Sequence, residues 1–247
     1  PTQYTSCELL LGVYAYAIQI YCDFSAYSDI AIGSSLLLGL ELPPNFNAPY
    51  RARDLRDFWR RWHISLSAWL RDYLYISLGG SKGSAFSTYR NLMLTMVLGG
   101  LWHGAGWTFV AWGFLHGIGL SITRAWQRWR TPKQYRWPVK ALALVATFHF
   151  VCLGWIFFRA PKFEQAWEIL RGLCELSFGT ANITPLLWCL LGVGFVTHLV
   201  PDSIVEVVRR QFVHFPAFVQ AVLLLGVILG VKYATTTDVA PFIYFQF

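Results

Sequence analysis

Residues 91–123 read NLMLTMVLGGLWHGAGWTFVAWGFLHGIGLSIT, and their only ionisable side chains are His103 and His116. The run is longer than one membrane span of about 20 residues and a little short for two full spans. Four glycines lie within residues 99–106, where they disfavour a continuous helix and let the backbone approach a substrate closely. We therefore predict a turn near residues 99–106. His103 is a candidate functional residue, because a titratable group is costly in such an apolar segment.

The composition is typical of a membrane protein. Of the 247 residues, 55% are hydrophobic and 13% are charged, whereas about 25% of a soluble domain is charged. The 12 Trp and 12 Tyr suit belts at two membrane interfaces. We predict an all-α polytopic membrane protein with the lipid bilayer as its partner and no nucleic-acid partner; a soluble protein with a large core is the alternative. Its apolar runs of near-spanning length are residues 7–22, 24–42, 91–123, 139–158, 184–200 and 217–234.

Basic residues predict the topology of these runs. Lys and Arg are concentrated in residues 43–90 and 124–140, which the positive-inside rule assigns to the cytoplasm. The run between them must then enter the membrane and return, with His103 at its turn. The chain begins at Pro1, and we expect residues 1–247 to be a single membrane-embedded domain that is the C-terminal part of a longer protein.

The polar interval 43–90 is predicted to be a cytoplasmic or interfacial amphipathic segment. Two prolines, Pro43 and Pro44, end the preceding helix. From Asp54 onward, aromatic and apolar residues recur at spacings of three and four, which predicts one helix with an aromatic face. His63 falls on that face and is expected to point inward. The members of the face are Phe58, Trp59, Trp62, His63, Leu66, Trp69, Leu70 and Tyr73.

Two histidines are the leading candidates for chemistry. A neutral imidazole at His103 could act as a general base, and the neighbouring glycine N–H groups could stabilise an oxyanion. His63 could orient a substrate or relay a proton. Each has a structural alternative: a core histidine bonded to a carbonyl for His103, and an interfacial ring packed by tryptophans for His63. His116 lies in the same apolar run and could line the same cavity as His103, but a structural role is favoured for it, as for the remaining histidines.

Charged groups give weaker signals. Asp23 and Asp29 could mark an ion or proton path, or they could belong to a buried network that joins helices. An arginine group could bind the phosphates of a cytoplasmic donor, or it could reflect the ordinary basic excess and contacts with lipid headgroups. This group is Arg51, Arg53, Arg56, Arg60 and Arg61. No cluster has the spacing of metal ligands, so no metal site and no bound cofactor are predicted.

Several blocks of the sequence together resemble the membrane-bound O-acyltransferase family, in its alginate O-acetylase branch. They are residues 21–33, 45–73, 91–105 and 241–247, which extend over essentially the whole chain. The chain departs from the family pattern at Ala26, where glycine is expected, and the family's N-terminal helices are not among its residues.

The resemblance implies both a fold and an activity. The family fold is a ring of transmembrane and re-entrant helices around a central tunnel. The family moves an acyl group from a cytoplasmic thioester, such as acetyl-CoA, across the membrane to a hydroxyl on the other side. His103 matches the family's catalytic histidine, and His63 matches its second characteristic histidine.

The function expected from this resemblance is O-acetylation of an exported polysaccharide such as alginate. The protein would lie in the bacterial inner membrane and work with a periplasmic acetyltransferase subunit. The candidate substrate- or donor-binding residues are Arg60, Arg61, Trp62, Trp102 and Asp23. D-alanyl transfer to teichoic acid is one alternative, and a polytopic transporter or exporter is another.

Overall fold

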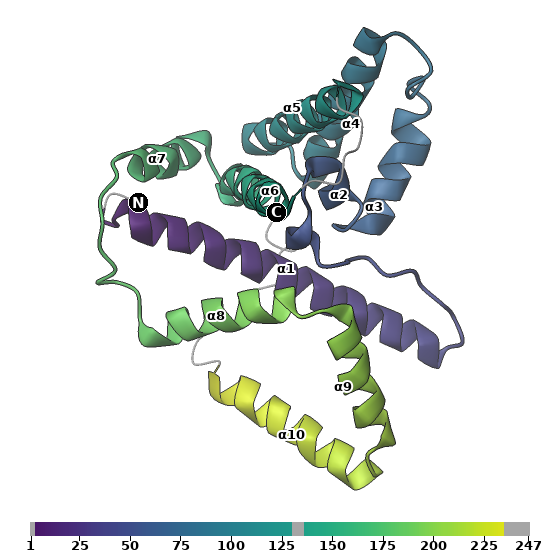
Figure 1. Ribbon diagram of the computed structural model, residues 1–247, viewed down its shortest axis with the longest axis vertical. Coiled ribbons are helices and arrows are strands. Elements are labelled where there is room, and N and C mark those ends of the chain that lie inside the picture. The colour runs from purple at the N-terminus through teal and green to yellow at the C-terminus, as the bar shows by residue number, and fades with distance from the viewer. Residues whose placement is uncertain (1–2, 130–135, 235–247) are drawn as a thin grey trace. The chain divides into compact units, whose positions relative to one another are not determined.

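The computed structural model of the protein describes residues 3–129 and 136–234 (Figure 1). All regular structure in these two stretches is helical, which confirms the predicted all-α class. The chain forms two compact units, residues 1–194 and 195–247. The closing sequence block at residues 241–247 lies outside the described residues.

The first helix, α1 (Ser6–Leu37), unites the two apolar runs that the sequence divided at residue 23. The two-run prediction was wrong because Asp23 does not interrupt a helix when its neighbours keep helical backbone angles. Thr5 and Glu8 form a capping box at the start. Gly39, with φ +76°, follows the end of the helix. Much of the helix is exposed, up to 89% at Leu37, as suits a helix that faces lipid.

The run that decides the fold forms a helical hairpin, as predicted. Helix α4 (Ala85–His103) and helix α5 (Trp107–Trp129) are joined by residues 104–106 and pack along each other. Both helices extend beyond the apolar run that predicted them. The hairpin therefore places His103 at the last position of α4, directly before the turn.

The prediction that the glycines break the helix holds only for the turn. Gly99 and Gly100 lie inside α4. A Cβ atom at Gly100 would overlap the carbonyl oxygen of Phe109, and one at Gly113 would overlap the carbonyl oxygen of Met96. These glycines let the two helix backbones touch, as small residues do at membrane helix interfaces.

The interval before the hairpin contains short helices rather than the single amphipathic helix that was predicted. They are η1 (Pro49–Arg51), α2 (Leu55–Trp59), α3 (Ile64–Trp69) and the π-helical η2 (Leu70–Tyr75). The break lies at His63, whose φ of 43° and ψ of 58° are left-handed. A left-handed residue reverses the local chain direction, so the aromatic residues on the two sides of His63 do not share one helical face.

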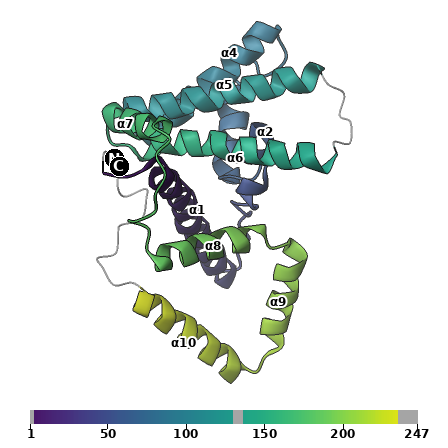
Figure 2. The same cartoon turned by 60° about the vertical axis from the view of Figure 1, so that its left-hand side comes forward.

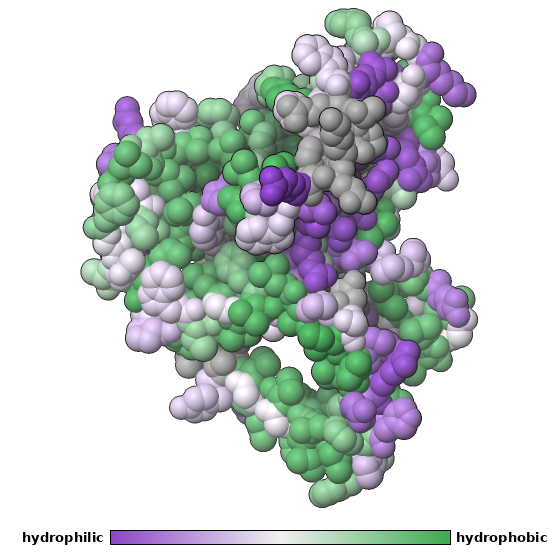
Figure 3. Space-filling model, in the orientation of Figure 1, coloured by the Kyte–Doolittle hydropathy of each residue, from purple (hydrophilic) through white to green (hydrophobic). Residues whose placement is uncertain are grey.

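Helix α6 (Trp137–Arg159) returns alongside α5 (Figure 2). By length and apolar character, α1 and α6 are the two described helices that could each cross a membrane. Helix α7 (Phe163–Cys174) is amphipathic and contacts α1 and α6. In Figure 3 much of the face over α7 and the first half of α1 is hydrophobic, which agrees with a surface that contacts lipid.

The last predicted spans coincide with two apolar helices. Helix α8 (Pro185–Leu199) has 15 residues and measures about 22 Å at 1.5 Å per residue, less than a bilayer core of about 30 Å. In the second unit, α9 (Asp202–His214) is amphipathic and α10 (Ala217–Ala234) is apolar.

The backbone contact between α4 and α5 leads to a test of stability. We expect Gly100→Ala to lower the free energy of unfolding by about 1–3 kcal/mol, because the added methyl group must displace the Phe109 carbonyl. Gly12→Ala in α1 is the matched control, since its Cβ would meet nothing within 4 Å. Thermal unfolding of both variants in detergent measures the difference, and equal melting temperatures would contradict the close contact.

Candidate active site

His103 is surrounded by aromatic rings. Its ring centroid lies 4.9 Å from that of Trp102, 5.2 Å from Trp112 and 5.2 Å from Phe158, all in edge-to-face geometry. Trp112 and Phe158 are buried, whereas Trp102 is 60% exposed. The imidazole is half-buried at the end of α4. One side of the ring packs against buried aromatic side chains, and the exposed part of the ring is accessible to a reactant.

The second histidine is held by Asn45. The Oδ1 atom of Asn45 accepts from the Ser65 backbone N–H at 3.1 Å and from the Ser65 hydroxyl at 2.9 Å, and it lies 3.3 Å from His63 Nδ1. The Asn45 amide nitrogen donates to Ser28 on α1. Because the backbone N–H fixes Oδ1 as an acceptor, His63 must carry its proton on Nδ1 when neutral. The lone pair is then on Nε2, which leaves that nitrogen free to accept a proton.

Burial and a charge on His103 both lower the pKa of His63. Burial, and to a smaller extent a charge on His103, lower the pKa of His63 to about 3. Edge-to-face contact with Phe24 of α1, at 4.6 Å between ring centroids, contributes to that burial. The fold thus brings two histidines that are 40 positions apart in sequence into electrostatic range of each other.

A buried aromatic cluster supports the loop that carries His63. Trp62 is 4% exposed, and its ring lies 5.0 Å from Phe46, 5.8 Å from Phe58 and 5.0 Å from Trp155 of α6. Of the two tryptophans proposed for the site, Trp62 is therefore part of the core, and Trp102 lies at the surface beside His103.

The remaining proposed site residues differ in their exposure and in their ion pairs and hydrogen bonds. Arg61 forms an ion pair with Asp57 at 2.8 Å and donates to the Asn47 carbonyl oxygen. Its charge is therefore partly neutralised within the protein. Arg60 is exposed. Asp23 is exposed on α1, directly before the Phe24 that contacts His63.

Sequence reasoning gave His116 a structural role and did not single out Asn45. His116 is fully buried, and Trp59 Nε1 donates to its Nδ1 at 3.3 Å. Its ring lies 4.9 Å from Trp112, which also contacts His103. Trp112 and His116 are four residues apart, so they lie on one face of α5. This spacing was the feature of the sequence that could have placed His116 beside the site. The role of Asn45 depends on contacts with residues 17 to 20 positions away, which no local pattern reports.

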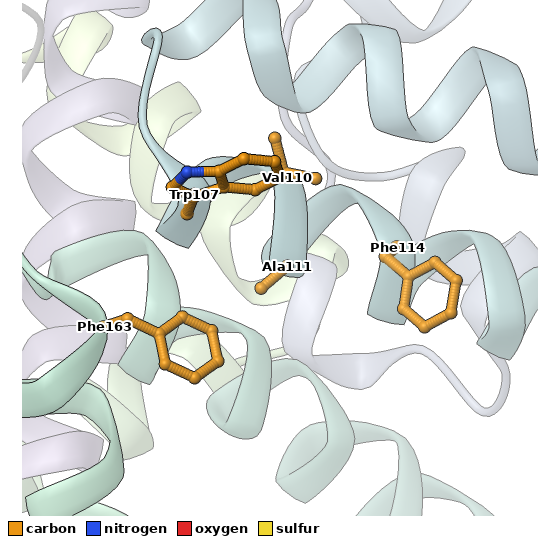
Figure 4. Close-up of a pocket in the computed structure, with 5 residues that line it drawn as sticks. All are labelled: Trp107, Val110, Ala111, Phe114 and Phe163. Carbon is orange, nitrogen blue, oxygen red and sulfur yellow. The ribbon is translucent and has the colours of Figure 1, made fainter.

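The first compact unit contains an apolar cavity and a cavity with basic residues in its wall. One is an open apolar hollow of about 440 Å³ on α5 and the start of α7 (Figure 4), lined by Trp107, Val110, Ala111, Phe114 and Phe163. With no charged lining residue, it suits lipid better than a polar substrate. The other, of about 290 Å³, has arginines in its wall. Among the described residues, no group of three or more His, Cys, Asp or Glu side chains is arranged to hold a metal ion.

Comparisons with known proteins establish the family. Residues 1–161 match the membrane-bound O-acyltransferase family, and the chain belongs to it. The matched part includes both histidines and the whole hairpin.

Several bacterial proteins are similar to this chain. A probable alginate O-acetylase of Azotobacter vinelandii is 50% identical over 182 residues, which are 74% of this chain and 35% of that protein. A peptidoglycan O-acetyltransferase of Helicobacter pylori is 50% identical over 163 residues, covering 66% and 31%. A teichoic acid D-alanyltransferase of Bacillus subtilis is 32% identical over 169 residues, covering 63% and 42%. The chain spans about a third of the length of the O-acetylases that it matches.

The lowered pKa of His63 predicts how stability changes with pH. The unfolded side chain titrates near pH 6.5 and the native one near pH 3, so unfolding takes up a proton between these values. The contribution of neutral His63 is present above pH 6.5 and is lost as the pH falls. Compared with His63→Gln, the wild type should lose at most about 2 kcal/mol more stability between pH 7 and pH 5.

Denaturation of the two proteins in detergent at both pH values measures this difference. The other histidines are common to both proteins and cancel. Identical pH dependence would mean that His63 is solvated in the folded protein.

Proposed function

We propose that this chain is the acyl-transferring part of a membrane-bound O-acetyltransferase. It would move an acetyl group from a cytoplasmic thioester, acetyl-CoA or a derivative of it, across the bacterial inner membrane for O-acetylation of an exported polysaccharide such as alginate. The observation that carries the proposal is the convergence of His103 and His63, from separate elements, within the part of the chain that matches the family. The O-acetylase relatives support acetyl as the acyl group.

In the proposed reaction His103 acts as the general base. It takes the proton of an acceptor hydroxyl while the hydroxyl oxygen forms a bond to the acyl carbon. The carbon–sulfur bond then breaks, and the proton passes to the departing thiolate. A covalent acyl relay on His103 is the variant in which the acceptor is reached in a second step.

His63 has a supporting role in this proposal. Its Nδ1 proton is held by Asn45, so Nε2 is available to accept a hydrogen bond from the acceptor hydroxyl or to relay its proton. Its low pKa keeps it neutral at physiological pH, as an acceptor of protons requires.

The remaining site residues complete the proposal. Arg60 and Arg61 would attract the anionic donor from the cytoplasm. Trp62, Trp102 and Asp23 would shape the site around the two histidines. The protein would be a multi-pass inner-membrane protein, and a periplasmic acetyltransferase subunit would complete transfer to the sugar. No bound cofactor is proposed.

D-alanyl transfer to teichoic acid is a second candidate function. The similarity to the Bacillus subtilis teichoic acid D-alanyltransferase favours it, and the same base chemistry would serve. The lower identity of this relative ranks it behind O-acetylation.

The central experiment removes the proposed base. We expect His103→Ala to abolish acetylation of the exported polymer, because the reaction loses its general base, while the protein accumulates in the membrane normally. His214→Ala, at the end of α9 in the second unit, is the matched control and should keep full acetylation. Acetyl content of the polymer, measured by NMR, decides the outcome. Persistent acetylation in His103→Ala would refute the assignment.

The hydrogen bond between Asn45 and His63 leads to a separate prediction about the rate of acetyl transfer. Asn45→Ala frees the His63 ring to adopt the other tautomer, and we expect the rate of acetyl transfer to fall by about 10- to 100-fold. Asn47→Ala is the matched control, because the contacts of Asn47 in the loop are made by its backbone. Equal rates in the two variants would show that the tautomer of His63 does not matter.

A further inference from the structure

His116 of α5 is a fully buried histidine beside the candidate site, and the proposed reaction gives it no task. Its side chain is 0% exposed. Its ring centroid lies 4.9 Å from that of Trp112 and 5.3 Å from that of Trp59 on α2. Trp112 also lies 5.2 Å from His103, with the planes of the two rings at 90°. Trp112 therefore contacts both histidines, and a change at His116 can reach His103 through this ring.

A hydrogen bond from Trp59 fixes the orientation of the His116 ring. The Nε1 atom of tryptophan can only donate, so the bond of 3.3 Å from Trp59 makes His116 Nδ1 the acceptor. The neutral ring then carries its proton on Nε2. A Cβ atom at Gly154 of α6 would lie 2.9 Å from this Nε2 atom and 3.3 Å from Trp112 Cδ1. The His116 ring is thus confined between α2 and α6, and a methyl group at Gly154 would displace it.

Packing alone does not explain a histidine at this position. The Nε2 atom of His116 and the Nε1 atom of Trp112 are both buried, and no residue in the described part of the chain accepts a hydrogen bond from either. A buried donor without an acceptor lowers stability, and folded proteins rarely keep one. A leucine would fill a similar volume without this cost. The cost of the imidazole favours a functional role for it over a purely structural one.

We propose that His116 is a positioning residue for His103 and acts through Trp112. The bond from Trp59 sets the plane of the His116 ring, and this ring packs against Trp112. Trp112 in turn packs against the imidazole of His103. The inference rests on the proposed function, because it takes His103 to be the general base. A displacement of about 1 Å in a reacting group can cost about 100-fold in rate, so His116 affects the reaction without touching a substrate.

The first test replaces the imidazole by a side chain of similar volume that forms no hydrogen bond. His116→Leu should slow acetyl transfer by about 10- to 100-fold. Its melting temperature in detergent should not fall, because the substitution removes an unpaired buried donor. His116→Gln has an amide oxygen that can accept from Trp59, so it should recover part of the lost rate. A purely structural role predicts instead a lower melting temperature and a rate that falls only with the amount of folded protein.

The second measurement follows the position of His103 directly by NMR. In protein with isotope-labelled histidine, the signal of His103 Cε1 is identified by its loss in His103→Gln. Its chemical shift depends on the ring current of Trp112, so the signal should move in His116→Leu. Gly154→Ala should also move it, because the added methyl group displaces the His116 ring. Gly33→Ala in α1 is the matched control and should leave the signal in place, since its Cβ would meet nothing within 4 Å.

Two results would each overturn the proposal: a His103 signal that stays in place in His116→Leu, or a transfer rate that this substitution does not change. The NMR measurement does not depend on acetyl transfer, so its failure is separable from that of the proposed function. A signal that moves, together with acetylation that persists in His103→Ala, would keep the positioning of His103 and refute its role as the base. Acetylation that requires His103, with a signal that does not move, would do the reverse.

Discussion

The contact between the backbones of α4 and α5 determines the position of the site. Gly100 and Gly113 each face a carbonyl of the opposite helix at a separation that excludes a side chain. Gly104 in the turn is confined in the same way by the ring of Phe109. Because the two helices cannot move apart without losing this contact, His103 at the end of α4 is fixed against Trp112 of α5. The other candidate residues are placed relative to that pair.

The aromatic rings around the site have two physical effects. They exclude water from one side of each histidine, which favours the neutral form that accepts protons. They also connect elements that are far apart in sequence, since Trp62 on the loop packs on Trp155 of α6 and Tyr50 joins α1 to α6 through its hydroxyl group. The site is thus held by the packing of aromatic side chains around its edges.

Sequence patterns predicted the hairpin but not its internal geometry. Charge at both ends of residues 91–123 and glycines near their centre were sufficient to place the turn and His103. The roles of Gly99 and Gly100 were misjudged, because a glycine that allows helix contact and a glycine that ends a helix look the same in sequence. The division of α1 into two runs failed because a single Asp is a weak helix breaker.

The surroundings of His63 could not be predicted for a different reason. Its left-handed backbone and its bond to Asn45 depend on tertiary contacts, whereas the helical periodicity of the flanking aromatic residues was a genuine local signal. The arginine cavity was likewise hidden, because Arg56, Arg71 and Arg124 are spread over 69 positions. Family resemblance identified the two histidines, and the fold adds that a charge on His103 contributes to the lowered pKa of His63.

A double-mutant cycle on His103 and His63 tests whether the two histidines form one acyl-transfer site. Transfer rates would be measured for the wild type, for His103→Gln, for His63→Gln and for the double variant. If both act on the same proton, the double variant is about as slow as the slower single variant, because residues that work as a unit are strongly non-additive. If the two losses multiply in the double variant, the histidines act independently and the single-site account is wrong.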